Sequence, residues 1–220
     1  MMDLFVIGDV HGCFHTYLTL MDQWDPKKEQ LIQVGDLVDR GNFSPDTIRL
    51  AFELKNTFKR TVHFIRGNHE QLLLEYIHEP KLDNWLYNGG KETLAQFEKS
   101  KLDIEFYANW INTLPFYWEN KEVLISHAGI SSFHPELYHP SHTESVLWNR
   151  KPLKNIGRLQ IHGHTPQLSG QPTFNEESNS WNIDTGAFRG LALTGIKLKA
   201  NGKLKEIITL PTLPEDYQKP

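Results

Sequence analysis

Five short polar motifs occur in a fixed order along this chain: GDVHG (8–12), GDLVDRG (35–41), RGNHE (66–70), SHAG (126–129) and GHT (163–165). They are rich in Asp, Asn and His, whose oxygen and nitrogen atoms are the ligands that divalent transition-metal ions accept in proteins. A pair of such cations is a common device for attacking a phosphate ester. The motifs therefore predict a two-metal hydrolytic site.

The candidate ligands form two sets that share one carboxylate. Asp9 and His11 alternate around Val10, so at the end of a strand both can face one cation. The two oxygens of Asp36 can bridge that cation and a second one roughly 3.5–4 Å away. The full predicted ligand set is Asp9, His11, Asp36, Asn68, His127 and His164.

Taken singly, each of these residues is weak evidence, because an isolated histidine is more often a hydrogen-bonded structural or surface group. We keep that interpretation for the other histidines, including His162, which we place in the core or behind His164. The agreement of residue type, order and position favours the metal site for the five motifs together. Water fills the remaining ligand positions, and a hydroxide between two dications, its pKa lowered to about 7, is a nucleophile that needs no catalytic Ser or Cys.

Residues beside the predicted ligands carry groups that can act on a phosphate ester. His69 follows Asn68, and we expect it to donate a proton to the leaving alkoxide while Asp39 orients its ring. Arg40 can bind two phosphate oxygens with its forked guanidinium. Arg150 is a candidate for a second phosphate contact, and a plain surface arginine is an equally good interpretation.

Short apolar runs that are typical of buried strands precede the motifs: LFVI (4–7), LIQV (31–34), VHFI (62–65), VLI (123–125) and LQI (159–161). Helix-length segments alternate with the first three runs, which predicts βαβ units around a largely parallel sheet. We expect helices over residues 15–24, 44–58, 70–78, 91–99 and 104–114. Ser44 is the expected N-cap of the second helix, and the last three helices form a small cap around the turn at residues 88–90.

Strands predominate from Phe116 onward. They include runs at 117–119 and 181–183 and a hairpin of residues 191–198 and 204–210. The fold class is therefore α/β. We expect one domain over residues 1–210 and a loose, Pro-containing tail over residues 211–220.

Length and composition exclude several classes of protein. The 220 residues are 39% hydrophobic and 23% charged, as in ordinary globular proteins, and no apolar stretch approaches the roughly 20 residues of a membrane span. A net charge of −4 without a dense basic run gives no reason to expect a nucleic-acid partner. We see no targeting leader, and the one cysteine, Cys13, forms no internal disulfide, so we expect a cytoplasmic protein.

The ordered motifs, with LWNR (147–150) and IDTGA (183–187), resemble the calcineurin-like metallophosphoesterase superfamily, and within it the bacterial and phage phosphoprotein phosphatases of the lambda type. The resemblance covers nearly the whole chain and implies a four-layer αββα sandwich. It also implies the same ligand roles, His69 as acid with Asp39, Arg40 and Arg150 on phosphate, and Mn²⁺ as the metal, with Fe or Zn as alternatives. Many superfamily members carry a second histidine where this chain has Pro166, which implies a water-richer first metal site here.

We therefore expect a protein serine/threonine phosphatase, open also to phosphotyrosine, that acts on phosphorylated proteins or peptides by in-line attack of a metal-bridging hydroxide. The alternative is a symmetrical diadenosine tetraphosphate hydrolase, although 220 residues leave little chain for nucleoside contacts. A non-catalytic metal- or phosphate-binding regulator is a third hypothesis. The joint presence of His69, Asp39 and Arg40 speaks against it, because a binding protein needs no proton donor.

Overall fold

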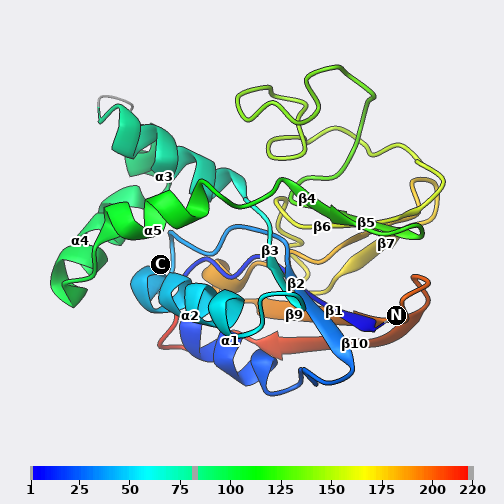
Figure 1. The fold of residues 1–220 in the computed structure, drawn as a ribbon, viewed down its shortest axis with the longest axis horizontal. Helices are drawn as coiled ribbons and strands as arrows, with labels where there is room; N and C mark the ends of the chain where they lie inside the picture. Colours follow the sequence, from blue (N-terminus) through cyan, green and yellow to red (C-terminus); the bar gives the residue numbers. More distant parts are fainter. Residues whose placement is uncertain (1, 81–83, 218–220) are drawn as a thin grey trace.

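Two five-stranded sheets face each other in the structure, a computed structural model that describes residues 2–80 and 84–217 (Figure 1). The first sheet has the strand order β10-β9-β1-β2-β3 and the second β4-β5-β6-β8-β7. The strands of the first sheet are β1 (Asp3–Ile7), β2 (Glu29–Gln33), β3 (Val62–Phe64), β9 (Ala192–Leu198) and β10 (Leu204–Pro211). Those of the second are β4 (Tyr117–Glu119), β5 (Val123–Ser126), β6 (Leu159–His162), β7 (Thr173–Asn175) and β8 (Ser180–Asn182).

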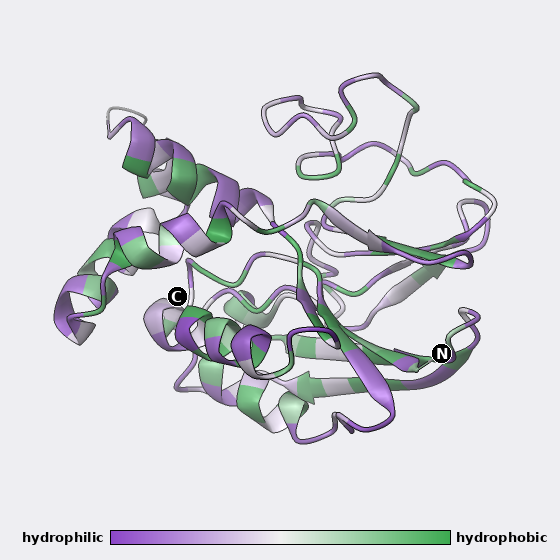
Figure 2. Ribbon diagram, viewed as in Figure 1, coloured by the Kyte–Doolittle hydropathy of each residue, from purple (hydrophilic) through white to green (hydrophobic). Residues whose placement is uncertain are grey.

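A buried apolar cluster joins the two sheets. Leu4, Val6 and Ile32 of the first sheet share it with Val123 and Ile161 of the second, and all five side chains are fully buried. Hydrophobic residues run along the strands of the first sheet (Figure 2). Each such side chain stabilises the fold by about 1.5–3 kcal/mol relative to exposure, so this cluster holds the sheets together.

Helices cover the outer face of the first sheet. Helix α1 (Phe14–Met21) contacts β9 and β10, and α2 (Ser44–Thr57) contacts β3. Helices α3 (Asn68–His78), α4 (Lys91–Ser100) and α5 (Ile104–Ile111) continue this layer past the edge of the sheet (Figure 1). The outer face of the second sheet is covered by the loop between β5 and β6, through Leu124, Ile130, Leu137 and Val146.

The predicted α/β sandwich of two mixed sheets is confirmed; helices flank the first sheet, and the loop between β5 and β6 forms the outer layer of the second. The start of α2 differs from the prediction in its capping residue. The N-cap of α2 is Phe43, whose side chain makes no capping bond, and Ser44 is already helical. The Ser44 hydroxyl instead accepts the backbone N–H of Asp39 at 2.9 Å, and this bond stabilises the loop after β2.

The segment from Pro211, which we expected to be a loose tail, is attached to the domain through Asp216. Residues 218–220 lie outside the described residues. Asp216 is fully buried, and its carboxylate accepts the backbone N–H groups of His15 and Thr16 at 3.0 and 2.7 Å. These are N–H groups of the first turn of α1, which lack partners within the helix. Asp216 therefore caps α1 from about 200 residues away along the chain, a pairing that local sequence does not reveal.

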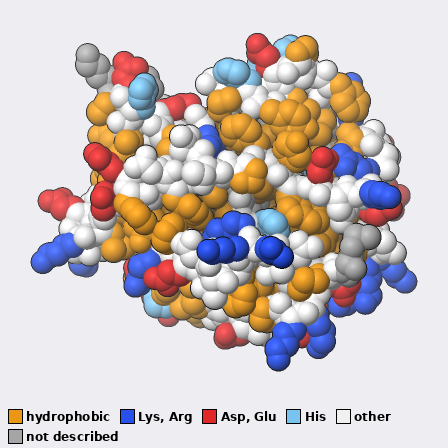
Figure 3. Space-filling model, in the orientation of Figure 1, with side chains coloured by type: hydrophobic (Ala, Val, Ile, Leu, Met, Phe, Trp, Pro, Cys, Tyr) orange, Lys and Arg blue, Asp and Glu red, His pale blue; other side chains and the backbone are white. Residues whose placement is uncertain are grey.

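Among the described residues, no helix combines the length and the apolar character that a bilayer crossing requires. Hydrophobic side chains gather on one face over the loop between β5 and β6 (Figure 3), where Phe133 and Tyr138 are exposed. Charged side chains of both signs are scattered around this face.

Candidate metal centre

The predicted ligands all follow parallel strands. Strands β1, β2 and β3 run parallel to one another, as do β5, β6 and β8 in the facing sheet. The carboxyl ends of parallel strands meet at one edge, where open α/β sheets bind ligands. Asp9, Asp36 and Asn68 reach this edge from the first sheet, and His127 and His164 reach it from the second.

Three of these ligands converge closely. Asn68 Oδ1 lies 2.8 Å from His127 Nε2 and 2.7 Å from His164 Nδ1, and the two imidazole nitrogens are 3.2 Å apart. Asp36 joins this group, with Oδ1 3.4 Å from His127 Nε2. The second predicted ligand set is therefore assembled as one buried cluster.

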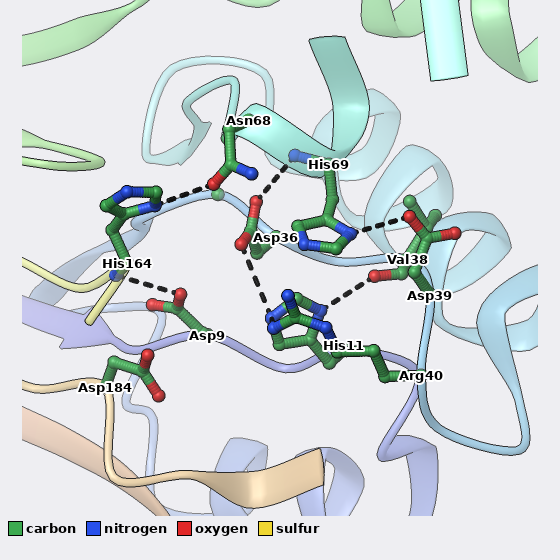
Figure 4. Close-up of polar contacts among 12 residues, drawn as sticks. Asp9, His11, Asp36, Val38, Asp39, Arg40, Asn68, His69, His164 and Asp184 are labelled. Carbon is green, nitrogen blue, oxygen red and sulfur yellow. Dashed lines mark hydrogen bonds and ion pairs between the residues drawn. The ribbon is translucent and has the colours of Figure 1, made fainter. Parts of the chain in front are cut away.

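Asp36 also belongs to the first predicted set. Its Oδ2 lies 3.4 Å from His11 Nε2 (Figure 4), so its two oxygens face two different imidazoles, those of His11 and His127. The tightest group around His11 contains His69 in addition to Asp36, and Asp9 lies outside it. Asp9 is held at the same site through its Oδ2, which accepts the backbone N–H of His164 at 3.0 Å.

The donor atoms are oriented for cations. His11 and His127 each place Nδ1 2.9 Å from a backbone carbonyl, that of Val38 and Val34 respectively. A carbonyl only accepts, so Nδ1 carries the proton and the Nε2 lone pair faces the site. Asp9 Oδ1 and His164 Nε2 are buried and have no hydrogen-bond partner within the described part of the chain. Buried polar atoms rarely stay unpaired, so the site fits divalent cations.

The backbone at this edge is strained. Of seven non-glycine residues with positive φ in the described chain, five lie in the site: His11, Asp36, Asp39, Arg40 and His164. Each such residue costs about 1–3 kcal/mol and persists only when its surroundings enforce it. Strain of this kind concentrates at functional sites.

Glu70 supplies part of that enforcement. Its fully buried carboxylate accepts the backbone N–H groups of Asp36, Leu37 and Gly67 at 2.7, 2.8 and 2.9 Å. It thereby ties the loop after β2 to the start of α3. Glu70 lies inside the RGNHE motif, but its role depends on contacts that the motif alone does not disclose.

The predicted pairing of His69 with Asp39 is present. His69 Nδ1 lies 2.7 Å from Asp39 Oδ2, and both side chains are buried. The same Oδ2 accepts Trp85 Nε1–H at 2.8 Å, and Oδ1 accepts the Thr93 hydroxyl at 2.6 Å. Asp39 is therefore fixed by donors from three segments, two of which the sequence analysis did not identify.

The two predicted phosphate-binding arginines make different contacts around the site. Arg40 donates from Nη1 to His11 Nε2 at 3.0 Å, and its guanidinium stacks 4.4 Å from the centre of the Phe188 ring. A cation on His11 Nε2 requires Arg40 to release this bond and turn outward. Arg150 is exposed and donates to the Thr165 hydroxyl at 3.3 Å, beside His164.

The comparison with protein families agrees with this geometry. The family model described as calcineurin-like phosphoesterase matches residues 2–202. The chain belongs to this family. Members of the family use a dinuclear divalent metal centre, and this phosphoesterase carries two buried groups of candidate ligands that share Asp36.

Individual relatives have several named activities. Serine/threonine-protein phosphatase 1 of Salmonella typhimurium is 30% identical over 87% of this chain and 89% of its own. An asymmetrical bis(5'-nucleosyl)-tetraphosphatase of Bacillus cereus is 25% identical over 97% of both chains. A Saccharomyces cerevisiae serine/threonine phosphatase structure has a TM-score of 0.69 at 18% identity, covers 96% of this chain and 80% of its own, and shows the fold alone.

Charge interactions in the phosphoesterase site are strong. Burial acts to lower the pKa of His127, but the Asp36 carboxylate outweighs burial and raises this pKa to about 9. Burial acts to raise the pKa of Asp36, and His127 and His69 hold it well below the usual value. Burial and then the charge of Asp184 raise the pKa of Asp9 well above its usual value.

Asp184 is a site residue that the sequence analysis missed. It follows β8 at the same edge as the predicted ligands, is 1% exposed, and lies beside Asp9 (Figure 4). Burial raises its pKa to about 6. The available signal was an acidic residue directly after the apolar run at 181–183, the same pattern that identified Asp9 and Asp36.

Proposed function

We propose that this phosphoesterase hydrolyses phosphoserine and phosphothreonine esters in proteins or peptides, with Mn²⁺ as the preferred metal. The observation that carries the proposal is the buried His69–Asp39 pair directly beside a six-residue ligand set. The Salmonella phosphatase, similar over most of both chains, supports the choice of substrate.

The proposed ligands divide into two sets. Asp9, His11 and Asp36 hold one cation, and Asp36 with Asn68, His127 and His164 holds the other. When bound, the two cations supply Lewis acidity toward the phosphate and lower the pKa of the attacking water. Soft ligands are missing from both sets, so oxygen-preferring Mn²⁺ suits them.

The remaining side chains act on the substrate. Arg40, turned outward from His11, and Arg150 bind the phosphate oxygens and align phosphorus for in-line attack. The Nδ1–H group of His69 donates its hydrogen bond to Asp39. The proton on Nε2 is therefore the one that His69 transfers to the serine or threonine oxygen as the ester bond breaks. A side-chain alkoxide is a poor leaving group, and this proton makes its departure possible.

A second candidate is hydrolysis of dinucleoside tetraphosphates, which the full-length match to the Bacillus cereus enzyme favours. A chain of 220 residues is long enough for an asymmetrical enzyme, because that relative aligns over 97% of both chains; our expectation about length concerned the symmetrical enzyme. The relative is named as an asymmetrical enzyme, whereas we expected a symmetrical one as the alternative.

The deciding experiment compares a phosphoserine peptide with diadenosine tetraphosphate at equal Mn²⁺. We expect the higher kcat/KM on the peptide. A clear preference for the dinucleotide would reverse the ranking, and its products would separate symmetrical cleavage, two ADP, from asymmetrical cleavage, ATP and AMP. Turnover of neither substrate would refute both proposals.

We also propose that the protein is located in the cytoplasm.

A further inference from the structure

Among the described residues, only one of the two carboxylate oxygens of Asp184 has a hydrogen-bond partner. Oδ1 accepts the backbone N–H of Gly186 at 3.0 Å and so holds the turn that follows β8. Oδ2 is buried and has no hydrogen-bond partner among the described residues. A residue needed only for the turn could be Asn or Ser, so the turn does not explain the second oxygen.

Asp9 presents the same pattern next to it. Its Oδ2 accepts the backbone N–H of His164, and its Oδ1 is buried without a partner. The backbone packs tightly here: a Cβ at Gly8 would lie 2.3 Å from the carbonyl oxygen of Ile183, and one at Gly163 would lie 1.8 Å from Asp9 Oδ1. The two carboxylates are thus held beside each other by adjoining backbone.

Neither carboxylate is in direct contact with a cationic side chain among the described residues. No ion pair within the described residues involves Asp9 or Asp184, although both are at least 98% buried. Placing two carboxylates together in a buried site is costly unless a positive charge compensates them. Their free oxygens lie at the edge that also holds His11, His164 and Asp36 (Figure 4).

We propose that Asp184 is a seventh residue of the metal centre and binds, together with Asp9, the cation on the His11 side. This inference rests on the metal centre of the proposed function and adds a ligand to it. A third carboxylate gives that cation a harder and more negative site, which favours Mn²⁺ over metals that prefer nitrogen or sulfur ligands.

The test uses Asp184→Asn in the full chain, because Asn keeps the size and the Oδ1 acceptor for Gly186. We expect two effects of opposite sign. The metal-free variant should have a higher Tm than wild type, since a neutral amide replaces a buried carboxylate whose Oδ2 has no partner among the described residues. Its affinity for one of two Mn²⁺ ions should fall about 10- to 100-fold by calorimetric titration.

The matched control is Glu29→Gln. Glu29 is also a buried carboxylate, but it pairs with Lys197 at 3.2 Å at the far end of β2. Its substitution should lower the Tm with and without Mn²⁺ and leave Mn²⁺ affinity unchanged. Asp184→Ala, tested in parallel, should weaken the same Mn²⁺ ion.

Two results would overturn the proposal. One is an Asp184→Asn protein that binds both Mn²⁺ ions as tightly as wild type. The other is a metal-free Tm that falls as in Glu29→Gln without any change of affinity. Since no substrate is present, either result leaves the phosphatase proposal intact, whereas a wild-type chain that binds fewer than two Mn²⁺ ions would remove the metal centre itself.

Discussion

At the scale of single residues, the ligand types were readable from sequence because each lies inside a short motif after an apolar run. The residues that hold those ligands were not readable. Trp85 and Thr93 reach Asp39 across 46 and 54 positions, and Glu70 reaches the Asp36 loop across 34. These supporting hydrogen bonds form only when segments that are distant in the sequence meet in the fold, so no local sequence pattern predicts them.

His69→Asn tests the proton donor. We expect Mn²⁺ binding to be unchanged and kcat on a phosphoserine peptide to fall about 10²- to 10⁴-fold, because Asn cannot deliver a proton. The loss should be much smaller on p-nitrophenyl phosphate, whose leaving group departs without protonation. Steady-state kinetics on both substrates check this.

The control for that variant is His63→Asn, since His63 is half-buried beside Gln30 outside the site. It should leave kcat unchanged on both substrates. Equal losses on the two substrates in His69→Asn would mean that His69 is not the acid.

Trp85→Phe and Thr93→Val test the support of Asp39. Each removes one donor to the carboxylate that orients His69, so we expect kcat to fall about tenfold with little change in KM, and the pH–rate profile to shift. Thr93→Ser, which keeps the hydroxyl, should restore most of the activity.

Trp24→Phe is the matched control for Trp85→Phe. Trp24 Nε1 donates to the Glu29 carbonyl at 3.0 Å, far from the site, so its loss removes a comparable hydrogen bond. Stability should fall in both variants. A similar kcat in both would show that Trp85 only stabilises the fold.

At the scale of elements, strands and helices with a continuous apolar face were predicted closely, such as α4 at Lys91–Ser100 and β5 at Val123–Ser126. Strand β7 was not, because Thr173–Asn175 is exposed on both faces and has no hydrophobic period. The turn expected at residues 88–90 is present within Leu86–Gly90, because Asn88 and Gly89 have non-helical backbone angles there, with φ of −104° and +110°. Its shape is set by packing on the loop after β2.

Gly89→Ala tests this packing. Gly89 has φ of +110°, and a Cβ there would lie 2.7 Å from the Arg40 backbone nitrogen and 2.9 Å from Asp39 Cβ. We expect a loss of stability of about 1–3 kcal/mol in urea unfolding and a lower kcat, because the Asp39–Arg40 turn must move.

Gly157→Ala separates strain from packing. Gly157 also has positive φ, +75°, but nothing lies within 4 Å of its added Cβ. It should lose stability from backbone strain alone and keep full activity. An equal kcat for the two variants would contradict a role for the segment at Leu86–Gly90 in the site.

At the scale of the whole molecule, the two sheets bring carboxylates and imidazoles together, and cations and protons compete for these groups. His127 has a pKa of about 9 in the fold against about 6.5 when unfolded. A raised pKa adds stability that is fully present below pH 6.5 and is lost as the pH rises through 9. The metal-free protein should therefore become less stable over this range.

Thermal unfolding in EDTA and in excess Mn²⁺ between pH 6 and 9 checks this expectation. Binding at Nε2 excludes the proton, so the Tm gain from Mn²⁺ should grow with pH. A gain that is constant across the range would show that His127 does not exchange its proton for a cation.

The capping of α1 by Asp216 has a consequence for the synthesis of the protein. Helix α1 begins directly after the loop that carries His11, and its first-turn N–H groups are satisfied by Asp216, about 200 residues further along the chain. During synthesis these N–H groups lack their partner until residue 216 has emerged from the ribosome. Ribosome-bound chains lacking residue 216 should therefore have a first turn of α1 that is about 0.5–2 kcal/mol less stable, even with every ligand and His69 already synthesised.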